Sequence, residues 1–446
     1  MKSKIYFILS VLILNFSLLN INQISIRDTP EVEKSTLNIS NNNELYYIDW
    51  ELTWGGPEQE YGRGGIAIDN NGSIYIAGST YSYGSGGYDA FLFKYDENGK
   101  KVWNLTWGDS QHQMPHDIAI SPSGNIYITG EYGSIGGIPT YVFLVKFDSN
   151  GSYQWDDKWG PSDWNEGYGV AVDEHENIYV TGRAGSDFVL LKYNSDGIQT
   201  WNKIDTNLQE GKDVAIGAPG TLYTIGRIGD QAYLSKYNDN GIMIWHRVWG
   251  GSSFEHVEAM AVDNLYNVYF TGATSSFGAG REDVYIIKYS SSGSLIWNIT
   301  WGTPFYEYAN GITLDENNNI YLTGETDMTT LISGCDTSAS NMSGANNAFI
   351  AKFDPQGNNI WYDTWGNHDF TVGNRIGLDA EGCIYVTGTT YRSGGGEGDL
   401  FLVKYKPSPI KIPPLYIPGY ELFTIAIIGV ILIIGIVQKK YFCLKN

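Results

Sequence analysis

Carboxylates that stand beside aromatic rings are the residues of this sequence with the types and spacing to bind a ligand. They recur in four short segments, "PEQEYG", "DWNEGY", "FEHVE" and "FYEY". Carboxylate oxygens hydrogen-bond sugar hydroxyls or coordinate a divalent cation, and an aromatic ring supplies an apolar contact surface. The candidate binding residues in these segments are Glu60, Tyr61, Trp164, Glu166, Glu255 and Glu307.

Four aspartates form a second candidate group, because each begins a segment of strand character. They are Asp89, Asp187, Asp283 and Asp399. We expect them on the same face as the first group. The alternative for both groups is structural, since a carboxylate at a repeated position commonly caps the backbone N–H groups of its own loop. Their near-periodic placement favours capping.

Motifs for catalysis, metals and cofactors are absent from the sequence, which has no Gly-x-Ser-x-Gly, Walker loop or Cys-x-x-Cys pair. His112 and His116 share the segment "HQMPH". Pro115 prevents the helix that would present both rings to one metal. Segments such as "DENG" lack the terminal Glu of a calcium loop and are interpreted as turns. We therefore predict no catalytic residue, no metal site and no cofactor.

The charge balance excludes nucleic acid as an expected partner. The chain carries 49 acidic and 28 basic residues, a formal net charge of −21. Binding to a phosphate backbone requires clustered Lys and Arg side chains. An acidic surface of this kind favours solubility.

A repeat of about fifty residues must position the candidate groups. Its most regular segment, "IYIAG" or a variant, ends at Gly78, Gly130, Gly182, Gly226, Gly272, Gly324 and Gly388. Another segment carries a Lys–aromatic pair such as Lys94–Tyr95 and also occurs in every unit. Short β-branched and aromatic segments separated by turn clusters predict four strands in each unit.

The fourth segment of each unit begins with a tryptophan. The seven tryptophans are Trp50, Trp103, Trp155, Trp201, Trp245, Trp297 and Trp361. The copy headed by Trp50 precedes every unit, whereas the last unit lacks one. A closed ring resolves this mismatch if residues 46–56 supply the outer strand of the last blade. We therefore predict an all-β, seven-bladed β-propeller over 46–406.

These tryptophans allow two interpretations, a ladder for sugar stacking or a packing contact between blades. A tryptophan side chain buries roughly 150–250 Å² and so dominates a contact when it is enclosed. Recurrence in every blade favours packing. This interpretation moves the expected binding site to the loops.

The unit "YGRGGIAIDNNGSIYIAGSTYSYGSGGYDAFLFKYDENGKKVWNLTWG" resembles the β-propeller repeat of the SBBP type. The resemblance extends over the whole of 46–406. It implies a secreted or surface-anchored scaffold and assigns no activity. The segment "PGYE" near the C-terminus is similar to the anchoring signals of archaeal surface proteins.

The N-terminal residues have the pattern of a secretory signal. Lys2 and Lys4 precede an apolar run, so 1–26 is interpreted as a signal peptide or, alternatively, an uncleaved anchor. The polar, Asn-rich stretch 27–45 is interpreted as a linker.

The C-terminal residues have the pattern of a stalk and a membrane anchor. The segment 407–420 is rich in proline and is expected to form an extended spacer. An uncharged apolar run lies within 421–438, and Lys439 and Lys440 follow it. We expect a transmembrane helix there and a cytoplasmic tail at 439–446.

We expect a non-enzymatic cell-surface propeller that binds an extracellular glycan or a surface protein through its acidic, aromatic loops. The alternative is an extracellular enzyme, a hydrolase, lyase or quinoprotein-like propeller acting on carbohydrate or a small molecule. An enzyme should break the repeat with His, Tyr, Arg or carboxylate side chains at the ring axis. The irregular residues evident in the sequence include His112, His256 and Arg375.

Overall fold

The computed structural model describes seven stretches of the chain, which are residues 38–39, 45–133, 139–304, 306–327, 346–366, 370–391 and 398–408. The expected signal, nearly all of the linker and stalk, the expected membrane helix and the tail lie outside these residues. Within the described stretches, no helix has the length and apolar character needed to cross a membrane.

The first four blades follow the chain from the inner to the outer edge. Blade 1 contains β3 (Glu60–Tyr61), β4 (Ile66–Ile68), β5 (Ile74–Thr80), β6 (Asp89–Tyr95) and β7 (Lys101–Trp107). Blade 2 contains β8 (Gln113–Ile120), β9 (Ile126–Tyr132), β10 (Tyr141–Phe147) and β11 (Tyr153–Trp159). Blade 3 contains β12 (Asn165–Val172), β13 (Ile178–Ala184), β14 (Asp187–Tyr193) and β15 (Gln199–Asp205). Blade 4 contains β16 (Glu210–Ile216), β17 (Thr221–Ile228), β18 (Gln231–Asn238) and β19 (Met243–Trp249).

The remaining blades repeat this order until the last outer strand. Blade 5 contains β20 (Glu255–Val262), β21 (Val268–Thr274), β22 (Asp283–Tyr289) and β23 (Leu295–Trp301). Blade 6 contains β24 (Glu307–Leu314), β25 (Ile320–Thr326), β26 (Asn347–Phe353) and β27 (Asn359–Trp365). Blade 7 contains β28 (Phe370–Leu378), β29 (Ile384–Tyr391), β30 (Asp399–Pro407) and the N-terminal β2 (Leu45–Trp54).

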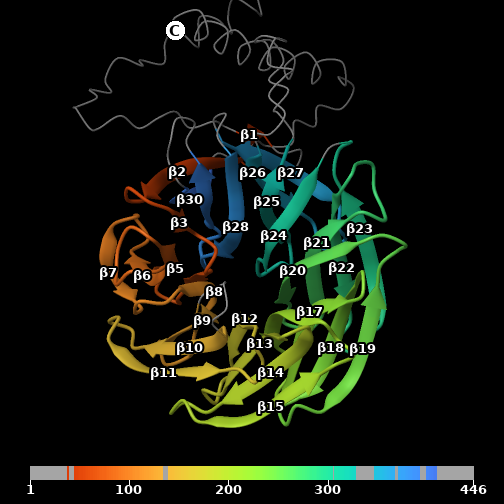
Figure 1. Cartoon of the computed structure of the whole chain (residues 1–446). Coiled ribbons are helices and arrows are strands. Elements are labelled where there is room, and N and C mark those ends of the chain that lie inside the picture. Colours follow the sequence, from red (N-terminus) through yellow and green to blue (C-terminus); the bar gives the residue numbers. More distant parts are fainter. Residues whose placement is uncertain are drawn as a thin grey trace, which may run out of the picture. The chain divides into compact units, whose positions relative to one another are not determined.

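The predicted closure by the N-terminal strand is confirmed. β2 pairs antiparallel with β30, with Trp50 opposite Lys404, and the two-residue β1 (Asn38–Ile39) extends the same sheet. Each inner strand contacts the inner strand of the next blade, and β28 contacts β4, so the blades form a closed ring. In Figure 1 the inner strands β8, β12, β20, β24 and β28 surround the centre, and the outer strands lie at the rim. The ring spans Leu45–Pro407, against the predicted 46–406.

The apolar core lies between blades rather than within one sheet. The second strand of each blade is packed on both faces, and in β5 every residue is buried. Tyr75 of blade 1 packs in one cluster with Ile118 and Phe143 of blade 2. A blade therefore cannot bury its second strand without both neighbours, and this dependence favours a closed ring.

The first tryptophan of each outer strand lies against the turn of the next blade. The Trp103 ring is 6.1 Å from that of Tyr75, and a Cβ placed on Gly151 would lie 3.2 Å from the Trp103 ring. Trp201 Nε1 donates to the Asp239 backbone oxygen of the next blade at 3.1 Å. Trp361 is buried and the other six rings are half-buried against the neighbouring blade, as a packing contact requires.

Candidate functional site

The connections that start inner strands and the connections that end second strands lie on one face, which we call the loop face. In blade 1, Glu60 pairs with Thr80, and Thr80 pairs with Asp89. The same row recurs in blade 5 as Glu255, Thr274 and Asp283. The structure thus places both predicted groups of carboxylates at equivalent heights on the loop face.

The glutamates at the start of three inner strands accept hydrogen bonds from the backbone of the loops that precede them. Glu60 is fully buried and accepts bonds from Gly56 N at 2.9 Å and Thr80 Oγ1 at 2.9 Å. Glu307, also fully buried, accepts bonds from Thr303 N at 2.8 Å and Thr303 Oγ1 at 2.6 Å. Glu255 accepts a bond from Gly251 N at 2.9 Å.

The aspartates at the start of third strands hold loops in the same way. Asp89 accepts a bond from Ser85 N at 2.8 Å, and burial raises the pKa of its carboxyl. Asp283 accepts a bond from Gly280 N at 2.9 Å. Asp187 is half-buried beside Ser186 Oγ at 3.4 Å, and Asp399 is half-buried against Gly55. Tyr61, on the inner strand of blade 1, lies under the guanidinium of Arg63 at 5.3 Å.

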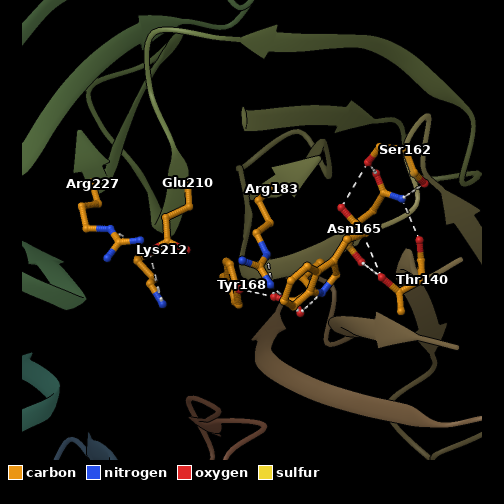
Figure 2. A network of polar contacts seen from close by, with 10 residues as sticks. Thr140, Ser162, Asn165, Tyr168, Arg183, Glu210, Lys212 and Arg227 are labelled. Carbon is orange, nitrogen blue, oxygen red and sulfur yellow. Dashed lines mark hydrogen bonds and ion pairs between the residues drawn. The ribbon is translucent and has the colours of Figure 1, made fainter. Parts of the chain in front are cut away.

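Glu166 and Trp164 differ from these loop caps because Asn165 fills the capping position of blade 3. Asn165 Nδ2 donates to Thr140 O at 2.6 Å and to Ser162 O at 2.7 Å, and its Oδ1 accepts from Ser162 Oγ (Figure 2). Glu166 follows it by one residue and is free of the loop backbone. Because Asn165 makes the loop contacts, the carboxylate of Glu166 can bind other side chains.

Glu166 lies at the centre of a charged and aromatic cluster. Arg183 contacts it through Nε at 3.0 Å and Nη2 at 3.1 Å, and Trp164 Nε1 donates to it at 2.6 Å. The Tyr168 hydroxyl donates to the second oxygen of Glu166. The Arg183 guanidinium also lies 3.9 Å over the Trp164 ring, whose side chain remains 48% exposed. This arrangement presents a pre-oriented aromatic ring to solvent.

A bulge in six inner strands leaves one residue of each strand outside the strand pairing, and these inner strands surround the centre of the ring (Figure 1). We call these residues, with the residue in the break between β3 and β4, the bulge ring. They are Arg63, His116, Tyr168, Lys212, Glu258, Asn310 and Asn374. The rings of His116 and Tyr168 are 5.4 Å apart, and Lys212 Nζ lies 4.6 Å over Tyr168. Bulges of this kind re-aim side chains next to functional sites.

Beneath the bulge ring, two carboxylates face one guanidinium. Asp117 accepts a bond from Val170 N at 2.8 Å, and Asp213 accepts one from Met260 N at 2.8 Å, so each ties together two blades. Arg375 donates to the backbone oxygens of Asn310 at 3.1 Å and His116 at 3.3 Å. Burial raises the pKa of both carboxyls, and Arg375 opposes this rise.

His116 is held neutral near the axis. Burial lowers the pKa of its imidazole to about 4, the Glu166 carboxylate raises it, and the cations of Lys212, Arg375 and Arg63 lower it further. Its Nε2 has no hydrogen-bond partner among the described residues. Glu131 lies nearby, and burial together with the Glu166 charge raises its pKa to about 7.

A pocket opens on the loop face of blades 5 and 6. Its volume is about 570 Å³, and its walls include Arg281, Pro304, Tyr306, Asp327 and Asn346. The Tyr306 ring stacks on Tyr308 at 6.1 Å, and the Tyr308 hydroxyl donates to Glu258 of the bulge ring at 2.5 Å. The pocket is therefore joined to the axial residues through two tyrosines.

Metal-binding groups are not assembled in the part of the chain that the structure describes. No set of three or more His, Cys, Asp or Glu side chains is placed to hold a metal ion there. His112 Nδ1 accepts a bond from Tyr88 N at 2.9 Å, whereas His116 lies on the inner strand. What the axial residues offer is hydrogen bonding, ring stacking and charge.

Sequence reasoning missed most of the axial residues. Arg63, Tyr168, Arg183, Lys212 and Arg227 were not among the candidates. Arg63, Tyr168 and Lys212 differ from the residues at their equivalent positions in other blades, whereas Arg183 and Arg227 are equivalent to each other in blades 3 and 4. A position-by-position comparison of the repeats would have singled out the first three. The bulge hides this signal, because it places one residue per blade outside the regular alternation of strand residues.

Known β-propeller repeats match short segments of the chain. Residues 163–188 and 301–329 match the β-propeller repeat named SBBP. Residues 70–101 match a β-propeller domain of unknown function, DUF5122. An uncharacterised WD repeat-containing protein of Acanthamoeba polyphaga mimivirus is 22% identical over 362 residues. That match covers 67% of this chain and 26% of the relative, so the chain spans about a quarter of the relative's length.

Solved structures agree on the fold. The WD40 repeats of RRP9 superpose with a TM-score of 0.54 at 9% identity, over 83% of this chain and 100% of that one. A virginiamycin B lyase from Staphylococcus aureus, solved with quinupristin, gives a TM-score of 0.52 at 11% identity, over 79% and 98%. At these identities the likeness concerns the fold alone. The chain is a seven-bladed β-propeller of four-stranded blades that carries SBBP-type repeats.

Proposed function

We propose that this protein is a non-enzymatic, surface-displayed propeller that binds an extracellular saccharide at the centre of its loop face. The observation that carries the proposal is the placement of exposed aromatic rings. Tyr81, Tyr83, Trp164, Phe277 and Phe370 are all exposed, and all lie on the loop face. Exposed rings beside hydrogen-bonding side chains suit the alternating apolar and hydroxyl surfaces of a sugar.

Two local arrangements support a saccharide in particular. Trp164 is fixed on one side by Arg183 and at its Nε1 by Glu166, so that stacking costs little side-chain entropy. The pocket beside Tyr306 offers a carboxylate, an amide and a guanidinium from Asp327, Asn346 and Arg281. These are groups that accept and donate hydrogen bonds to several hydroxyls at once.

Glycan-array binding of the purified full-length chain tests the proposal. Trp164→Ala and Tyr306→Ala should each weaken binding about tenfold or more, as expected for loss of an aromatic anchor. The matched control is Tyr153→Ala, because Tyr153 is also exposed but lies on the outer strand β11. If no glycan binds, or if all three variants bind alike, the proposal is wrong and protein partners take its place.

The loop-capping carboxylates give a second discrimination. Glu60→Gln, Glu255→Gln and Glu307→Gln should lower thermal stability, because each removes a charge-assisted bond to loop backbone. Glycan affinity should change far less than in Trp164→Ala. If these three variants lose glycan binding at unchanged stability, the site belongs to the periodic carboxylates and not to the axis.

An enzyme acting on carbohydrate is the second candidate, and one observation favours it. Glu131 has a raised pKa and Glu166 a lowered one, although they are neighbours. Such a pair is a common arrangement of an acid and a base. However, both oxygens of Glu166 are already engaged by Arg183, Trp164 and Tyr168, which leaves this carboxylate little capacity to act as a base. This engagement favours binding. Release of reducing ends from a bound glycan, abolished by Glu131→Gln, would establish the enzyme instead.

A further inference from the structure

The axial residues of blade 4 include two cations whose hydrogen-bonding capacity is unused. Lys212 Nζ lies 3.8 Å from Glu210 Oε1, and Arg227 Nε lies 3.5 Å from the same oxygen. Among the described residues neither side chain makes a hydrogen bond, and the buried Arg227 Nε has its ion pair with Glu210 but no hydrogen-bond partner. Figure 2 shows Arg227 and Lys212 beside Glu210, with Tyr168 on the other side of Lys212. The single carboxylate of Glu210 therefore forms an ion pair with both cations but accepts a hydrogen bond from neither.

Lys212 and Arg227 are therefore two cations grouped around the single carboxylate of Glu210. We call Lys212 and Arg227 the basic cluster.

The basic cluster is surrounded by rings that restrict where its cations can move. Lys212 lies over Tyr168 at 4.6 Å, and Arg227 lies over Phe254 at 4.7 Å. Cation–ring contacts hold the cations in place without satisfying their N–H donors. Lys212 and Arg227 share the single carboxylate of Glu210, which leaves this group with one positive charge in excess. An anionic ligand would balance that charge and accept the free N–H groups.

We propose that the basic cluster binds the oxyanion of an acidic saccharide, a uronic-acid carboxylate or a sulfate, while the sugar rings contact the aromatic residues of the loop face. This assignment rests on the proposed saccharide binding and specifies its ligand class. Arg227 and Lys212 donate to the oxyanion from blade 4. The guanidinium fork of Arg227 matches two oxygens of such a group.

The test uses the full-length chain and two matched probes, tetragalacturonate and its fully methyl-esterified form, beside an array of neutral, uronate-containing and sulfated glycans. Wild-type protein should prefer the acidic members, and esterification should weaken binding about tenfold or more, as expected for loss of a charge-assisted contact. Lys212→Gln and Arg227→Gln should each erase the preference. Binding of sulfated members alone, lost in the same variants, identifies sulfate as the oxyanion.

The control is Lys203→Gln, because Lys203 is a lysine of similar exposure on the outer strand β15, 4.0 Å from Asp205. It should bind acidic glycans like the wild type. Folding of each variant is checked by its thermal transition. Equal binding of neutral and acidic glycans, unchanged in Lys212→Gln and Arg227→Gln, would overturn the basic cluster as a site and leave saccharide binding intact. Absence of binding to every glycan would remove both proposals.

Discussion

Lys404 Nζ donates a hydrogen bond of 2.8 Å to the backbone oxygen of Glu97, and this contact joins the last strand of the ring to the first blade. Equivalent bonds run from Lys146 to Ser195 O at 3.0 Å and from Lys192 to Asp239 O at 3.1 Å. The recurrent lysine of the third strand thus forms a hydrogen bond between neighbouring blades. At Lys404 the same bond connects blade 7 to blade 1 and helps to close the ring.

Replacing Lys404 by methionine should lower stability, because the Glu97 carbonyl loses its donor and the side chain of Lys404 is only 6% exposed. We expect a loss of about 1.5–3 kcal/mol, as for a hydrogen bond to a charged group. Denaturant titration measures it. The control is Lys94→Met, since Lys94 lies 4.8 Å over Tyr75 but makes no such bond. Equal losses of unfolding free energy in the two variants would show that the hydrogen bond of Lys404 to Glu97 does not stabilise the ring.

Gly99→Ala should destabilise the junction of blades 1 and 7. Gly99 has a φ of +76°, and a Cβ there would lie 2.9 Å from the Trp50 ring. Gly382→Ala is the matched control, because its φ is +77° and its Cβ would meet nothing within 4 Å. Both variants carry the backbone strain of about 1 kcal/mol or more. A larger decrease in melting temperature for Gly99→Ala than for Gly382→Ala would report the clash with the Trp50 ring. Equal decreases would show that the clash costs no stability.

Stability should depend on pH through the buried pair of Asp117 and Asp213. Because burial raises their pKa, the folded chain binds more protons than the unfolded one from about pH 4 upward. The stability that depends on these two carboxyls being protonated is therefore fully present in acid, and it is lost as the pH rises to neutral. His116, whose pKa is lowered to about 4, acts in the opposite sense below pH 6.5.

The variant Asp213→Asn isolates this effect. The difference in unfolding free energy between variant and wild type should move in favour of the variant as the pH rises from 4 to 7. Subtracting the two curves cancels His116. The control variant is Asp163→Asn, which removes an exposed aspartate and measures the effect of losing a carboxylate at the surface. A difference curve for Asp213→Asn that matches this control would contradict the role of the buried pair.

Cys383 should resist alkylation until the ring opens. Its side chain is fully buried in the contact between blades 7 and 1, and burial raises its pKa to about 12. The thiolate that reacts with iodoacetamide is therefore both rare and inaccessible. Mass spectrometry of the peptide that contains Cys383 should show labelling only at denaturant concentrations that unfold the chain. Labelling under native conditions would mean that this junction opens readily.

The repeat made the fold predictable, and the same regularity concealed the site. Seven copies of the second strand and the unpaired segment around Trp50 were enough to predict the ring and its closure. The carboxylates that stood out, such as Glu60, stand out because every blade needs a loop cap. Glu166 was among the candidates, and in the structure its contacts depend on Asn165 filling the cap. Glu166 lies one position further along its strand than Glu60 does in blade 1, so the cap falls on Asn165. The spacing of residues in the sequence does not reveal this shift.

The antiparallel pairing of β2 with β30 has a mechanical consequence. Tyr46 stands opposite Pro407, so the chain enters and leaves the ring at adjacent points of one sheet. Tension applied between these two points peels the strands apart from that end, one pair of hydrogen bonds after another, instead of shearing all of them together. The pairs between β2 and β30 would therefore break before those of the other blades. Once β2 has separated, blade 7 lacks its outer strand and the N-terminal strand no longer closes the ring.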